Sequence, residues 1–118
     1  MQPLPLELQG LAERVVQALQ QEAVKFAPSD ATPQIALAAV QFTPVIDPGN
    51  QLPGYQGVWR NARNDRCGVM TINSDHSVYA EYDLFCPHPR DERWFVEMVT
   101  VWGRGGDLRS EPSLIPNV

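Results

Sequence analysis

The chain has 118 residues, of which 43% are hydrophobic and 19% are charged, and its formal net charge at pH 7 is -5. This length suits one globular domain with its own core, and the composition excludes a disordered chain. The negative charge disfavours nucleic acid and anionic membranes as partners. No apolar run reaches the roughly 20 residues that cross a bilayer, and no basic segment typical of a secretion signal is present at the start. We therefore expect one cytoplasmic domain (1–118) without a cofactor.

The N-terminal segment 5–27 is expected to form an amphipathic helix, because apolar residues recur at spacings of three and four. Pro5 suits the first turn of a helix. Pro28 ends it, since the residue before a proline disfavours the helical conformation. The apolar stripe comprises Leu8, Leu11, Ala12, Val15, Leu19, Ala23 and Phe26.

The next segment, 34–43, is predicted to be a strand, because prolines at 33 and 44 bound an apolar middle. Its alanines would also suit a helix, but ten residues between two prolines favour a strand. Residues 44–57 contain three prolines and three glycines, which predict a long loop. Loops of this length are often functional or mobile, although a wide surface crossover explains the segment equally well.

A short strand around Trp59 is expected to precede three longer strands at about 66–73, 77–86 and 93–102. Their even-numbered positions are almost all apolar, and their odd-numbered positions mix apolar side chains with carboxylates. Side chains alternate between the two faces of a strand, so one face is predicted to pack on the helix. The fold class is therefore α+β. It has an N-terminal amphipathic helix on one face of a four- or five-stranded antiparallel meander, with 1–4 and 108–118 as extended tails.

Strand register predicts a candidate ligand site on the odd-numbered face. If Tyr82 pairs with Val96, Glu81 lies opposite Glu97, and Asp83 lies on the same face. Opposed like charges destabilise a sheet by roughly 0.2–1 kcal/mol, so solvent, arginine partners or a ligand should offset them. A solvated face with arginine partners is the simplest interpretation, and an acid–base pair is the alternative. The candidate ligand-binding residues are Tyr79, Glu81, Asp83 and Glu97.

The odd-numbered face is also too apolar to be left open to water, because large contiguous apolar patches usually mark contacts. The C-terminal tail, the 44–57 loop or a second copy of the chain could cover it. We expect a homodimer through this face. The predicted interface residues are Val69, Phe85, Phe95, Val99 and Val101.

Arginines and cysteines supply the remaining candidates. Arg60, Arg63 and Arg66 lie in and around one turn and could bind an anion or a nucleic acid. In an acidic chain, pairing with its own carboxylates is the favoured interpretation. Cys67 and Cys86 are expected on opposite faces and roughly 10 Å apart along the strands, too far for a disulfide. Without a paired Cys-x-x-Cys motif, no metal site is predicted.

Three functions remain, and none of them includes an identifiable catalytic arrangement. The favoured one is an interaction or accessory protein that acts through its sheet face, as a homodimer or with a partner protein. The second is a small-ligand-binding protein or enzyme with a pocket near Glu81 and Glu97. The third binds an anion or nucleic acid through the 60–66 turn. A flat open face would favour the first function, and a concave pocket with convergent polar groups the second.

Overall fold

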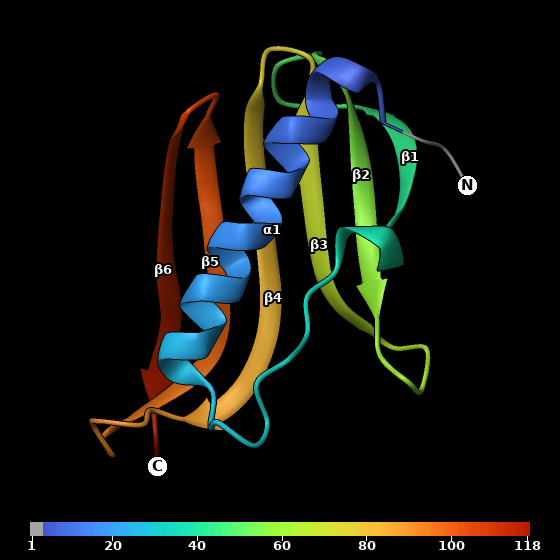
Figure 1. Ribbon diagram of the computed structural model, residues 1–118. Helices are drawn as coiled ribbons and strands as arrows, with labels where there is room; N and C mark the ends of the chain where they lie inside the picture. The colour runs from blue at the N-terminus through green and yellow to red at the C-terminus, as the bar shows by residue number, and fades with distance from the viewer. Residues whose placement is uncertain (1–3) are drawn as a thin grey trace.

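The computed structural model describes residues 4–118 as one helix packed on one sheet (Figure 1). The helix is α1 (Leu6–Phe26), and a short 3-10 helix, η1 (Leu37–Ala39), follows it. The strands are β1 (Gln41–Ile46), β2 (Pro53–Arg60), β3 (Arg66–Asn73), β4 (Ser77–Pro87), β5 (Trp94–Arg104) and β6 (Asp107–Pro116). They pair antiparallel in chain order. The predicted α+β fold is confirmed, with six strands in place of four or five. No helix in the described part of the chain is long and apolar enough to cross a membrane.

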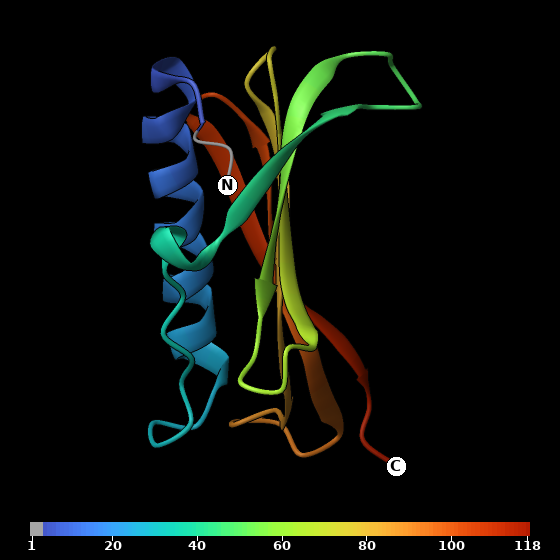
Figure 2. The same cartoon turned by 90° about the vertical axis from the view of Figure 1, so that its right-hand side faces the viewer.

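The apolar stripe of α1 is its buried face, as the spacing predicts. Val15 and Leu19 are completely buried, and they lie in one core with Met70, Ile72 and other apolar side chains of the sheet. Each such side chain contributes about 1.5–3 kcal/mol before the entropy of ordering the chain is subtracted. This burial fixes α1 against one face of the sheet, and Figure 2 shows the two layers edge-on.

The segment between α1 and β2 differs from its prediction. The expected strand at 34–43 and the expected loop at 44–57 are both wrong. The chain enters β1 only at Gln41, passes through Pro44 and stays paired with β2 as far as Ile46. Proline is tolerated there because β1 is an edge strand. Only residues 47–52 connect the two strands.

The chain before β1 is held by side chains instead of by a neighbouring strand. The Gln20 side chain uses both of its polar atoms: Nε2 donates to the carbonyl of Pro33 (2.9 Å), and Oε1 accepts from the amide of Ile35 (2.8 Å). The indole Nε1 of the buried Trp59 donates to the carbonyl of Ala36 (3.0 Å). These bonds satisfy backbone groups that a strand would have paired with its neighbour.

The predicted pairing of β4 with β5 is also wrong. Tyr82 lies opposite Val99 and not opposite Val96, so Glu81 faces Thr100 and not a second carboxylate. The register shifts between Asp83 and Cys86 on β4, and between Val96 and Met98 on β5. A bulge inserts an extra residue and reverses the alternation of faces beyond it.

The reversal decides which face each β5 residue occupies. Val99 and Val101 are completely buried under α1, although odd numbering predicts them on the other face. Met98 and Trp102 take their place on the far side. Residues predicted as a tail at 108–118 mostly form β6, which pairs with β5 and does not cover the sheet. Of the other predicted tail, residues 1–3 lie outside the described residues.

Candidate functional site

We define the open face as the side of the sheet opposite α1. In Figure 2 the helix lies on one side of the sheet, and no element of residues 4–118 lies across the other. In the observed register, the residues of the open face form rows across β3, β4, β5 and β6. Two of these rows are Val69–Glu81–Thr100–Glu111 and Thr71–Tyr79–Trp102–Arg109.

Glu81 lies near the middle of the open face and has its hydrogen bonds satisfied. Its Oε1 accepts from Nη2 of Arg66 (3.3 Å), and its Oε2 accepts from the hydroxyl of Tyr79 (3.3 Å). Burial raises the pKa of Tyr79, and the nearby charge of Glu81 raises it further. An arginine of the chain therefore pairs with this carboxylate, the arrangement favoured from the sequence.

Asp83 is two residues further along β4 and is half-buried. Among the described residues, no side chain donates a hydrogen bond to its carboxylate. Burial raises the pKa of Asp83, the charge of Glu81 raises it further, Arg66 opposes this, and Glu97 adds a smaller increase. The three predicted carboxylates are thus electrostatically coupled, although Glu81 and Glu97 are not opposite one another. The ionised form of Asp83 is poorly stabilised by its surroundings.

Glu97 occupies the irregular position of β5 and is half-buried. One of its oxygens accepts from the Ser113 hydroxyl at 3.5 Å, the outer limit of a hydrogen bond. Glu97 thus has a weak partner, and its charge is available to a group above the sheet.

Aromatic and aliphatic side chains surround these carboxylates on the open face. Tyr79 is 45% exposed, Phe85 60% and Ile115 40%. Phe85 lies in the β4 bulge with φ +47°, in the left-handed region that a bulky residue rarely adopts. That conformation costs roughly 1–2 kcal/mol, because the Cβ atom crowds the following carbonyl. An exposed aromatic residue in a strained backbone conformation contributes little to the fold.

The predicted interface residues divide between the two faces. Phe95 lies on the open face opposite Ile115, and Phe85 is the exposed bulge residue. Val69 also lies on this face but is buried among its neighbours, whereas the two remaining valines are in the core. Met98 and Trp102 also lie on the open face, although their even numbers predict the core face. Sequence reasoning missed this because no glycine or proline lies within either bulge.

The three arginines of the 60–66 turn do not converge on one point. Arg60 donates to the carbonyl of Asn64 within the turn (3.0 Å), and Arg66 pairs with Glu81. Arg63 is exposed at the tip. Two of the three guanidinium groups are therefore engaged within the chain, which leaves the anion-binding hypothesis without a preformed cluster.

The two cysteines are free thiols. Cys86 faces the core and donates to the carbonyl of Phe26 (3.4 Å), and burial raises the pKa of its thiol. Cys67 is half-buried on the neighbouring strand. Within residues 4–118, no three His, Cys, Asp or Glu side chains come close enough together to hold a metal ion.

We found no significant match between this chain and any protein-family model, curated protein or solved structure. The function of the chain is therefore inferred from its own geometry.

Proposed function

We propose that this protein is a small interaction protein that binds a partner protein through the open face, and that the partner contributes basic side chains. One observation carries the proposal. Asp83 is a half-buried carboxylate with no described hydrogen-bond donor, in the middle of a sheet face that no other described part of the chain covers. Half-buried charges without partners are costly, so a partner that supplies the missing donor is favoured.

The chemistry of the surrounding residues favours arginine in that partner. A guanidinium group donates hydrogen bonds to carboxylates in a planar fork and also stacks on aromatic rings. Asp83 and Glu97 supply the negative charge, and Tyr79 and Trp102 supply aromatic surface on the same face. Together these side chains match a basic strand or loop.

The strained aromatic residue in the bulge supports the same function. Strain in a backbone persists only where the surrounding structure enforces it, and such positions cluster at binding sites. Phe85 is exposed, so burial in this chain does not compensate its strain. Exposed aromatic side chains become anchors of an interface when a partner covers them.

A homodimer through the open face is less favoured than a separate partner. A two-fold axis brings the same patch of both copies together. The carboxylates of Glu81, Asp83 and Glu97 would then approach their own copies without compensating cations. Apposed like charges suppress such a pairing. The alternative of a ligand pocket near Glu81 and Glu97 has less support, because no element within residues 4–118 encloses the space above these side chains.

The proposal is tested with a short peptide of alternating arginine and valine as the probe. We expect NMR amide shifts to change on β4, β5 and β6, and the peptide to bind more weakly at high salt. The double variant Asp83→Asn/Glu97→Gln should weaken binding by roughly three- to tenfold, which corresponds to one or two partly exposed ion pairs. Glu13→Gln/Asp30→Asn, at two exposed positions on and after α1, removes the same number of charges, so it is the matched control and should leave affinity nearly unchanged.

Two results would contradict the proposal. One is equal affinity for a peptide of alternating glutamate and valine. The other is equal weakening by the control Glu13→Gln/Asp30→Asn and by Asp83→Asn/Glu97→Gln, which would mean that only the net charge of the protein attracts the probe.

A further inference from the structure

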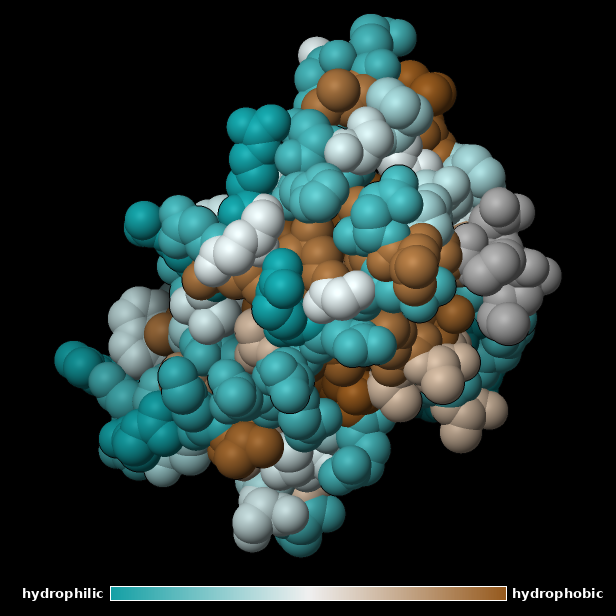
Figure 3. Space-filling model, turned by 45° about the horizontal axis from the view of Figure 1, so that its top comes forward, coloured by the Kyte–Doolittle hydropathy of each residue, from teal (hydrophilic) through white to brown (hydrophobic). Residues whose placement is uncertain are grey.

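An apolar cleft lies on the other side of the sheet from the carboxylates, where α1 begins and β1 and β2 diverge from it. Its volume is about 470 Å³. Three segments line it: the first turn of α1, the paired ends of β1 and β2, and the turn between β3 and β4. The lining residues that matter here are Pro5, Leu8, Pro44, Ile46, Pro53 and Tyr55. In the space-filling view that brings this end of the molecule forward, apolar surface lies exposed between hydrophilic side chains (Figure 3).

Three prolines form part of the wall of this cleft. Pro5 precedes the first residue of α1, and Pro44 and Pro53 belong to paired strands. Pro44 lies opposite Tyr55 in the register, and Ile46 lies opposite Pro53. Proline rings have fixed backbone angles, so these surfaces lose little entropy when a ligand covers them.

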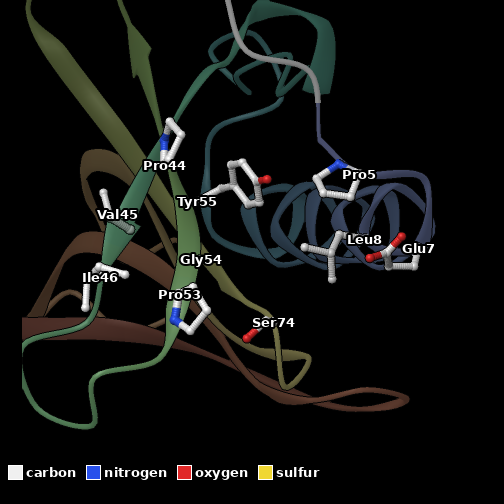
Figure 4. A pocket seen from close by; sticks show the side chains of 10 residues that line it. All are labelled: Pro5, Glu7, Leu8, Pro44, Val45, Ile46, Pro53, Gly54, Tyr55 and Ser74. Carbon is white, nitrogen blue, oxygen red and sulfur yellow. The ribbon is translucent and has the colours of Figure 1, made fainter.

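The cleft also holds a polar group at its centre. Figure 4 shows the Tyr55 ring projecting between Pro44 on one wall and Pro5 on the other, with its hydroxyl directed across the space. Tyr55 is half-buried, and no hydrogen bond of its hydroxyl is found among the described residues. The hydroxyl is therefore free to hydrogen-bond to a molecule that enters the cleft. A ligand with one hydroxyl or carbonyl group would provide a partner for it.

Exposed apolar surface at the rim of the cleft also supports ligand binding there. Ile46 is 59% exposed and borders the cleft, while Leu8 at its base is buried. Ligand sites are concave, mostly apolar, about 300–1,000 Å³ in volume and provided with a few polar groups. The carboxylate of Glu7 at the rim opposes an anionic ligand.

We propose that this cleft binds a small, neutral, ring-bearing molecule with one hydroxyl or carbonyl group, its ring packed against the proline walls and its polar group at the Tyr55 hydroxyl. The site is separate from the open face, so this inference does not depend on the proposed protein partner.

The first test uses N-phenyl-1-naphthylamine, a neutral dye that fluoresces in apolar sites. We expect saturable binding by the wild-type protein and a loss of about fivefold or more in affinity for Ile46→Lys, which places a charge over the mouth of the cleft. Val24→Lys is the matched control, because Val24 is 60% exposed on α1 and does not line the cleft. This control should bind the dye as the wild type does. Thermal melting of both variants checks that each is folded.

The second test isolates the hydroxyl group. Wild-type protein should bind 1-naphthol more tightly than naphthalene, and Tyr55→Phe should remove most of that preference while it keeps affinity for naphthalene. The proposal is overturned if the wild-type protein binds no dye saturably, if Ile46→Lys and Val24→Lys bind it equally, or if Tyr55→Phe leaves the preference unchanged.

Discussion

Asp83 shows how one side chain can oppose the fold that contains it. Because its pKa is raised in the folded protein, the native state holds this proton more tightly than the unfolded chain does. The free energy of unfolding therefore falls as the pH rises from the unfolded pKa of Asp83, and the loss is complete once the pH exceeds the folded pKa. Below the unfolded pKa of about 4, both states are protonated and this effect is absent.

We therefore predict that Asp83→Asn raises the free energy of unfolding near pH 7 and that the gain shrinks as the pH falls toward 3. Urea unfolding at several pH values measures this difference. Asp30→Asn, at an exposed position after α1, provides the comparison and should change stability little at any pH. A loss of stability at pH 7 in Asp83→Asn would mean that the carboxylate has a stabilising partner.

At the scale of elements, two glycines of the chain should respond in opposite directions to a methyl group. A Cβ atom at Gly57 would overlap the side chains of Val40 and Phe42, which cross β2 on the helix side of the sheet. A Cβ atom at Gly10, within α1, would meet nothing within 4 Å.

We predict that Gly57→Ala lowers the free energy of unfolding by about 1–3 kcal/mol, because an overpacked core must shift to accept the atom. Gly10→Ala should raise it by about 0.5–1 kcal/mol, because alanine favours the helix over the unfolded chain. Chemical denaturation of both variants measures the two changes. Equal effects of the two substitutions would show that β2 and β1 do not pack as closely as described.

The elements also show what the sequence could predict. Helical spacing located α1, and alternation located β3, β4 and much of β5, because these patterns depend on one face of each element. The segment at 34–43 could not be predicted, because long-range bonds from Gln20 and Trp59 decide its conformation. Residues 44–57 were misassigned because proline and glycine are also accepted at a sheet edge.

The candidate sites were predictable only in part. Strand alternation was enough to place Tyr79, Glu81 and Asp83 together on the face away from α1. The bulges then changed the partners of β5, and no local pattern in the sequence marks them. The cleft was missed because its walls come from three segments that are distant along the chain.

For the molecule as a whole, the open face predicts a monomer in the absence of a partner. Carboxylates at its centre and a net charge of -5 oppose self-association. Sedimentation velocity should show a monomer at low salt, with any weak self-association increasing at high salt, where repulsion is screened. A stable dimer that dissociates in a Phe95→Glu variant would instead show that the open face joins two copies.

Both outer strands of the sheet contain proline: Pro44 in β1, and Pro112 and Pro116 in β6. A proline has no amide hydrogen to offer to an added strand, so prolines at sheet edges hinder the pairing of one sheet edge with another. Growth into fibres by edge pairing is therefore opposed at both ends. The sheet can therefore expose a wide, partly apolar face while its two edges resist aggregation.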